Sequence, residues 1–180
     1  MAASLAEISE AFDRITEQYD VPVPIGGRCE SSTYYRVEYL SEHDLNNCAE
    51  YVAERLVDML APQPIHVFLK LPGGYTFFAE RLAALYSEVN PAAGDVIVEP
   101  YIEAKISNGL GDKYRGKNAI LVTDVITTAR SSLEAHTKAT LRGIHVACWA
   151  TLIDRTFGPG PVPVVSAFTG APVRVLTHIG

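Results

Sequence analysis

Cysteine is scarce in this sequence, and two other features are missing from it: an excess of positive charge and a long apolar run. The three cysteines among 180 residues, Cys29, Cys48 and Cys148, stand far apart. Their number and spacing fit neither a disulfide framework nor a zinc site. We therefore expect reduced, partly buried thiols in a cytoplasmic protein.

The missing features argue against two classes of partner. A formal charge of −6 does not suit a broad nucleic-acid surface, which needs cations to replace the counterions of phosphates. No apolar run approaches the roughly 20 residues that span a bilayer, and no signal peptide is visible. Hydrophobic content of 48% with 20% charged residues is ordinary for a folded protein. We expect one globular domain over residues 1–180, with no nucleic-acid or membrane partner.

The most informative stretch covers residues 118–132 and reads Asn-Ala-Ile-Leu-Val-Thr-Asp-Val-Ile-Thr-Thr-Ala-Arg-Ser-Ser. Its apolar start predicts a buried strand over 119–122. A helix then opens, because Ser131 followed three residues later by Glu134 is a capping-box pattern. Unpaired N–H groups at a helix start, together with the helix dipole, favour an anion. The stretch therefore predicts a phosphate cradle with four hydroxyls, those of Thr127, Thr128, Ser131 and Ser132.

One acid precedes this cradle. Asp124 suggests a polyol attached to the phosphate, because a carboxylate can accept two hydrogen bonds from vicinal hydroxyls. An ordinary strand-to-helix turn with a capping serine is the alternative interpretation of the same residues.

The stretch resembles the phosphoribosyl-pyrophosphate signature of type I phosphoribosyltransferases, in which an apolar strand leads into two acids, an apolar pair and a Thr/Gly/Ser loop. Asp124 and the residues after it match, while Thr123 stands where the first acid is expected. The resemblance implies that Asp124 is catalytic and holds the ribose hydroxyls. It also implies that the 5-phosphate lies on Thr127, Thr128, Ala129, Arg130 and Ser131, although small glycines are common in place of Ala129 and Arg130.

A second loop fits the same family. A nearly continuous apolar run over 65–70 predicts a central parallel strand, and a helix is expected over 76–87. Between them lie Gly73 and Gly74, whose lack of a Cβ lets a backbone come close to a ligand. The resemblance makes this turn the pyrophosphate loop, with Lys70 offsetting the charge. An ordinary tight turn and a solvated lysine are the alternatives.

The N-terminal third, residues 1–60, is expected to form a small hood. Apolar residues at spacings of three and four predict a helix over 4–19. Prolines and glycines then break regular structure, and a strand is expected over 34–40. A capped helix follows over 41–59.

Two tyrosines in this hood have two interpretations. Tyr34 and Tyr35 are either one aromatic on each face of a strand or a base-binding pair. The second interpretation comes from resemblance, because the segment Ser32-Thr33-Tyr34-Tyr35 is similar to the Ser-Pro-aromatic-aromatic segment of orotate phosphoribosyltransferases.

The segment before the phosphate motif is harder to match. Strands are expected over 95–98 and 101–106, and the polar, Gly-rich residues 107–117 predict an exposed lid. The catalytic loop of orotate phosphoribosyltransferases contains a Glu-x-Lys pattern, which Glu103-Ala104-Lys105 resembles. By this resemblance Lys105 is catalytic and helps to neutralise the diphosphate.

The chain after the motif completes the expected fold. A helix over 132–142 ends at Gly143, a strand over 145–153 ends in Asp154-Arg155, and closing strands are expected over 163–168 and 173–177. In orotate phosphoribosyltransferases such an arginine reaches the base, so the resemblance makes Arg155 a base-binding residue. A surface Asp-Arg pair is the alternative.

Strands that alternate with helices from Ile65 onward predict an α/β fold with an open, mostly parallel sheet flanked by helices. Residues 61–180 form this core, and residues 1–60 form the hood. The resemblance implies transfer of ribose 5-phosphate from phosphoribosyl pyrophosphate to a nucleobase, first of all orotate in pyrimidine biosynthesis, by a homodimer. Mg²⁺ would be carried by the pyrophosphate substrate, with no metal ligand from the protein. A regulatory phosphoribosyl-binding protein and a transferase for another base are the alternatives.

Overall fold

The structure is a computed structural model that describes residues 4–26, 29–72, 76–93, 96–100, 109, 111–156 and 160–175. A five-stranded parallel sheet forms its centre, in the order β4-β3-β5-β6-β7. The strands are β3 (Val67–Lys70), β4 (Ile97–Pro100), β5 (Asn118–Ile126), β6 (His145–Asp154) and β7 (Val164–Thr169). This α/β architecture confirms the predicted fold class.

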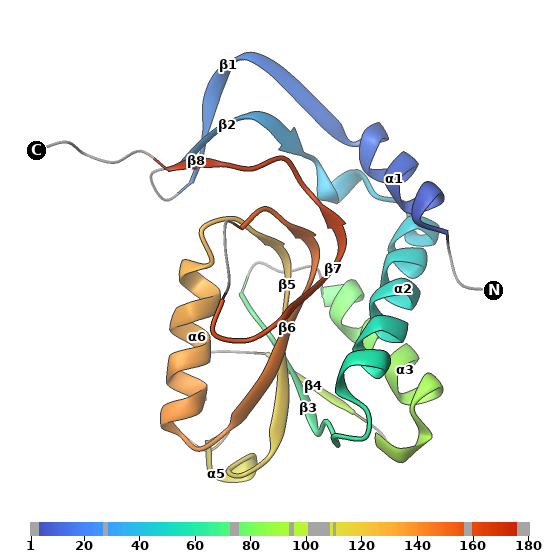
Figure 1. Ribbon diagram of the computed structural model, residues 1–180, viewed down its shortest axis with the longest axis vertical. Coiled ribbons are helices and arrows are strands. Elements are labelled where there is room, and N and C mark those ends of the chain that lie inside the picture. The colour runs from blue at the N-terminus through green and yellow to red at the C-terminus, as the bar shows by residue number, and fades with distance from the viewer. Residues whose placement is uncertain are drawn as a thin grey trace, which may run out of the picture.

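Helices cover both faces of this sheet (Figure 1). One face carries α1 (Leu5–Arg14), α2 (Glu42–Leu60) and α3 (Thr76–Val89), and the other carries α6 (Arg130–Leu141). Alternate residues of β5 serve the two faces: Ile120 and Val122 belong to the larger core cluster, while Ala119 and Leu121 belong to the cluster beneath α6. The sheet is therefore buried on both sides, as the continuous apolar runs predict.

A second, antiparallel sheet stands above the carboxyl ends of the core strands (Figure 1). Its order is β1-β2-β8, formed by β1 (Thr16–Gly26), β2 (Cys29–Tyr35) and β8 (Arg174–Val175). This is the expected hood, and it takes strands from both ends of the chain. The division of the chain at residue 60 stays a prediction.

Two boundaries in the hood differ from the sequence expectation. The helix expected over 4–19 ends at Arg14, because the following residues pair with β2 from Thr16↔Tyr35 onward. The strand expected over 34–40 ends at Tyr35, and a short 3₁₀ helix, η1 (Val37–Tyr39), follows. Pairing with a partner strand overrides the helical spacing of the apolar residues. The prolines of β1 are tolerated because β1 is an edge strand of its sheet.

Other expectations about the elements are confirmed. Ser41 caps α2 with Asp44 in a capping box, and Gly143 follows α6 with a φ of +79°. The three cysteines are buried thiols, and burial raises the pKa of Cys48 to about 12. Within the described part of the chain, no helix combines the length and the apolarity needed to cross a bilayer.

Candidate functional site

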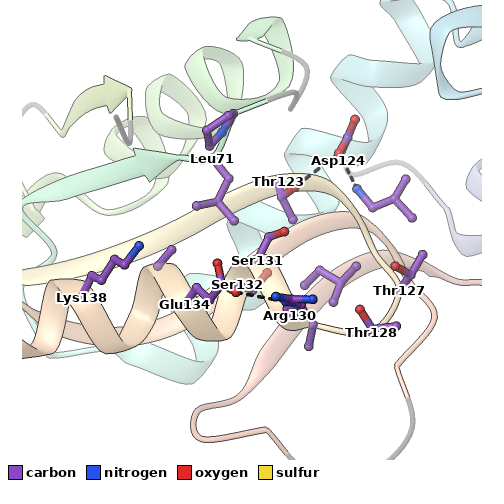
Figure 2. Close-up of a pocket in the computed structure, with 15 residues that line it drawn as sticks. Leu71, Thr123, Asp124, Thr127, Thr128, Arg130, Ser131, Ser132, Glu134 and Lys138 are labelled. Atoms are coloured by element: carbon purple, nitrogen blue, oxygen red, sulfur yellow. Dashed lines mark hydrogen bonds and ion pairs between the residues drawn. The ribbon is translucent and has the colours of Figure 1, made fainter. Parts of the chain in front are cut away.

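The carboxyl ends of β3, β5 and β6 meet beneath the hood, where ligands bind in open α/β sheets. A cavity of about 430 Å³ opens there, within the usual size range of small-molecule sites. Figure 2 shows its walls. They come from Leu71 and Pro72 after β3, from all residues of the segment 123–132, and from Glu134, Ala135 and Lys138 on α6.

The helix start in this cavity has no side-chain cap. Ala129 is the N-cap residue, with φ 59° and ψ 5°, and makes no side-chain hydrogen bond. The first bond of the helix runs from the Leu133 N–H to the Ala129 carbonyl at 2.8 Å. The N–H groups of Arg130, Ser131 and Ser132 therefore lack acceptors within the helix and are available to an anion.

The predicted capping box of Ser131 and Glu134 is wrong. The helix begins at Arg130, two residues before the expected start, because Ala129 takes the left-handed conformation that turns the chain into it. Glu134 instead accepts a hydrogen bond from Arg130 Nε at 3.1 Å. This helix start favours a ligand, since no serine side chain of the described residues occupies the backbone N–H groups of the first turn.

Asp124 lies at the end of β5 and lines the same cavity. Its Oδ1 accepts hydrogen bonds from the Val125 N–H at 2.8 Å and from the Thr123 hydroxyl at 3.3 Å. Its Oδ2 has no hydrogen-bond partner among the residues that the structure describes. One carboxylate oxygen thus fixes the side chain, and the other remains able to accept from a ligand hydroxyl.

Several other predicted residues lie outside this cavity or outside the description. Lys70 ends β3 and donates to the Thr76 hydroxyl at 2.5 Å, and it is not part of the cavity wall. Gly73, Gly74 and Lys105 lie outside the described residues. Their proposed roles therefore stay predictions.

Arg155 follows β6 and is 3% exposed. Its Nε donates to the Ala171 carbonyl at 2.6 Å, and its Nη2 donates to the Ser31 hydroxyl at 2.6 Å and to the Thr33 carbonyl at 3.2 Å. The guanidinium carbon lies 5.1 Å from the centre of the Tyr35 ring. Burial lowers the pKa of Arg155. This side chain therefore joins the core sheet to the hood.

The two tyrosines have different surroundings. Tyr35 is buried, and its hydroxyl accepts a hydrogen bond from the Ala171 N–H at 2.7 Å. Tyr34 is half-buried in β2, and the Arg36 guanidinium lies 5.0 Å from its ring centre. Neither ring is part of the wall of the cavity beside Asp124. The base-binding roles of Tyr34, Tyr35 and Arg155 stay predictions.

The described end of the expected lid lies away from the site. Residues 111–117 contain a short helix, α5 (Gly111–Lys113), near the amino end of β5, opposite the hood (Figure 1). Tyr114 is buried, and Lys113 pairs with Glu99 at 2.7 Å. Residues 112, 113 and 115–117 are exposed, as expected, but their place at the amino end of β5 does not suit a lid over the cavity. Residues 107, 108 and 110 lie outside the described part.

Four residues that line the cavity had no predicted ligand role: Leu71, Pro72, Glu134 and Lys138. A signal for two of them was present, because Glu134 and Lys138 follow Arg130 at intervals of four residues and so share a face of α6. Among the described residues, no group of three or more His, Cys, Asp or Glu side chains is placed to bind a metal ion.

Comparisons with known proteins support the fold. No family model matches the chain, and no curated protein matches it. Among solved structures, an orotate phosphoribosyltransferase from Aeropyrum pernix is similar at a TM-score of 0.67 and 23% identity, with 90% of this chain and 93% of that one covered. The Mycobacterium tuberculosis orotate phosphoribosyltransferase, solved with Fe(III) dicitrate, gives 0.61 and 17%, with 92% and 95% covered.

A third similar structure is a hypothetical protein from Neisseria gonorrhoeae with bound ppGpp, at a TM-score of 0.57 and 13% identity, with 73% of this chain and 81% of that one covered. The chain thus has the fold of the type I phosphoribosyltransferases. Within that fold it resembles the orotate phosphoribosyltransferases, which it matches over nine tenths of its length.

Proposed function

We propose that this protein is a phosphoribosyltransferase that transfers ribose 5-phosphate from phosphoribosyl pyrophosphate to a nucleobase and releases pyrophosphate. One observation carries the proposal: a single cavity holds an uncapped helix start and, in its wall, a carboxylate with one oxygen that has no partner among the described residues. A phosphate and a ribose joined to it need these two kinds of group side by side.

The reaction asks for positioning and electrostatics more than for acid–base chemistry. In a dissociative displacement at the anomeric carbon, positive charge develops on the ribose and negative charge on the departing diphosphate. The segment from Thr127 to Ser131 would hold the 5-phosphate. Asp124 would accept from a ribose hydroxyl and stabilise the positive ribose. Gly73 and Gly74, with Lys70 and Lys105, would hold and neutralise the diphosphate.

Mg²⁺ fits this site only as a companion of the substrate. Mg²⁺ is commonly bound through one or two carboxylates together with substrate phosphates. Asp124 is the carboxylate near the expected ribose, and the described residues contain no cluster that would bind a metal by itself. When bound, Mg²⁺ would neutralise the diphosphate as it leaves, and Asp124 would orient the ribose hydroxyls beside it.

Orotate is the first candidate for the acceptor base. Support comes from the resemblance of Tyr34, Tyr35 and Arg155 to the base-binding residues of orotate phosphoribosyltransferases. Arg155 Nη1 has no hydrogen-bond partner among the described residues, so one amino group of the guanidinium is available for a planar acceptor. A homodimer belongs to the same proposal through the resemblance alone, and sedimentation velocity would measure it.

The test mixes protein, Mg²⁺, phosphoribosyl pyrophosphate and orotate and follows the loss of orotate absorbance. Hypoxanthine and guanine in place of orotate measure base preference, with released pyrophosphate as the common readout. Turnover with orotate alone supports the full proposal, and turnover with a purine corrects the base. If the protein does not bind phosphoribosyl pyrophosphate at all, the proposed function is refuted.

A second candidate function is nucleotide binding without catalysis. Thr123 favours it, because a charged acceptor for a ribose hydroxyl is missing there, and hydrogen bonds to charged groups are worth about 1.5–3 kcal/mol. The Neisseria gonorrhoeae neighbour carries bound ppGpp, which is consistent with a phosphorylated ribonucleotide in this fold. Saturable binding of phosphoribosyl pyrophosphate without turnover of any base would select this function over the first.

A further inference from the structure

Arg130 introduces a charged side chain into the phosphate loop at a position where the resembling family commonly has a small residue. Its side chain is 83% exposed and lines the cavity of Asp124. Its Nε donates to Glu134 Oε1 at 3.1 Å, and Glu134, which is 56% exposed, lines the same cavity (Figure 2). The helix start therefore has a cation and an anion beside it, paired with each other.

The ion pair with Glu134 determines where the Arg130 guanidinium lies relative to the helix start. Glu134 stands one turn further along α6, so pairing with it draws the guanidinium away from the N–H groups of the first turn. Only Nε takes part in the ion pair, and Nη1 and Nη2 have no hydrogen-bond partner among the described residues. Arg130 is thus near the phosphate cradle but turned back from it.

A phosphate in the cradle offers Arg130 a better acceptor than Glu134. An exposed ion pair between residues four apart on a helix is weak and is screened by salt. A phosphate dianion carries more charge than a carboxylate, accepts two parallel hydrogen bonds from a guanidinium, and is itself held by the helix start. Exchange of the carboxylate for the phosphate is therefore favourable, and the carboxylate remains a competitor of the ligand.

We propose that Arg130 contacts the 5-phosphate of the ligand by exchanging Glu134 for it, so that the pair sets the affinity and favours the phosphate dianion. This inference rests on the proposed function, because it requires a phosphate in the cradle. It assigns the Arg130 side chain a contact of its own, in addition to the backbone N–H groups, and it makes Glu134 an inhibitory neighbour of the site.

The test measures binding of ribose 5-phosphate by calorimetry at low salt and pH 7.5. Arg130→Ala should weaken binding about fivefold, as expected for one exposed charge contact. Glu134→Gln should tighten binding about twofold, because it removes the competitor and a negative charge together. Arg142→Ala is the matched control: it removes the same charge from the opposite end of α6 and should leave binding unchanged.

A pH series separates a charge contact from a loss of structure. The second pKa of a phosphate monoester is about 6, so the dianion gives way to the monoanion between pH 7.5 and 5.5. The wild-type affinity should fall over this interval, and the affinity of Arg130→Ala should fall less. Equal pH dependence of the two proteins would contradict the selection of the dianion.

Ser131→Ala removes a hydroxyl from the cradle and should weaken binding whether or not Arg130 contacts the phosphate. If the wild type binds ribose 5-phosphate and Arg130→Ala binds it as tightly as Arg142→Ala does, the inference about Arg130 is wrong and the cradle stands. If Glu134→Gln weakens binding, Glu134 positions Arg130 and does not compete. If the wild type does not bind the ligand, the proposed function fails, and this inference fails with it.

Discussion

The ends of β5 and β6 are neighbours in the sheet, yet they are used in opposite ways. Ile126 at the end of β5 is aligned with Asp154 at the end of β6. After Ile126 the chain turns through Ala129 into a helix start whose N–H groups face a cavity. After Asp154 it places Arg155 in the interior, where three described acceptors receive its hydrogen bonds.

The difference shows two ways of using a carboxyl end of a parallel sheet. At the end of β5, which we call the open end, Asp124 Oδ2 and the first N–H groups of α6 have no partner among the described residues, so this end can hold a ligand. At the end of β6, which we call the closed end, the guanidinium of Arg155 donates to Ser31, Thr33 and Ala171. This end therefore holds the hood in place above the end of β5. Four predictions test this contrast, beginning with the largest expected effect.

Asp124→Asn tests the open end. It should lower turnover about 100-fold, because loss of a charge that stabilises the positive ribose removes about 2.7 kcal/mol from the transition state. The melting temperature should change little, since an asparagine oxygen can still accept a hydrogen bond from the Val125 N–H. Steady-state rates and thermal unfolding measure both effects.

Asp112→Asn is the control for this prediction, because Asp112 is an exposed acid on α5, at the other end of β5. It should retain full turnover. Equal rates for Asp124→Asn and Asp112→Asn would place the chemistry elsewhere in the molecule.

Arg155→Ala tests the closed end. It should lower the free energy of unfolding by about 3 kcal/mol, because a buried hydrogen-bonding partner is removed from three acceptors. For a chain of this size the melting temperature should fall by roughly 6–12 °C. Arg155→Lys should recover little of this, because a lysine lacks the planar fork.

Exposed Arg142→Ala serves as the matched control and should leave the melting temperature within about 1 °C of the wild type. The contrast between the two strand ends would be overturned by an Arg155→Ala protein of normal stability. If its KM for the base is then raised, Arg155 serves the base site alone and does not hold the hood in place.

The structure at the end of β5 is easier to predict from the sequence than the structure at the end of β6, for a physical reason. The strand and the loop around Asp124 are contiguous in the chain, so local patterns contain most of their structure. The partners of Arg155 are separated from it by 124, 122 and 16 residues. No local pattern identifies them, and only the folded hood brings Ser31 and Thr33 to this side chain.

Even at the end of β5, local patterns miss the helix cap. Ser131 and Glu134 have the right identities and spacing for a capping box, but the left-handed Ala129 starts the helix before them. An alanine gives no sequence signal for that conformation. The hood boundaries fail similarly, because the pairing of Thr16 with Tyr35 depends on a residue 19 positions away.

Gly170→Ala tests the closed end in a second way, because it adds a methyl group where the core sheet packs against the hood. An added Cβ would lie 2.8 Å from Ile153 Cγ2, 2.9 Å from Arg155 Cγ and 3.0 Å from Tyr35 Cε2. Overpacking of this kind should lower the free energy of unfolding by about 2 kcal/mol. Gly160→Ala is the control, because its Cβ would meet no atom of the described residues closer than 3.4 Å, and its stability should stay near that of the wild type.

The smallest expected effect is a gain in the free energy of unfolding, from relief of backbone strain at the open end. Ala129 has a φ of 59°, a conformation that is costly for a residue with a Cβ and nearly free for glycine. Ala129→Gly should therefore raise the free energy of unfolding by about 0.5 kcal/mol, after the greater entropy of glycine in the unfolded chain is subtracted. Ala139→Gly, in the buried interior of the same helix, should lower it by about 1 kcal/mol. Urea unfolding of the two variants measures both signs. A loss of stability in Ala129→Gly would mean that the alanine side chain holds the loop in place, and that the cradle depends on packing as well as on backbone geometry.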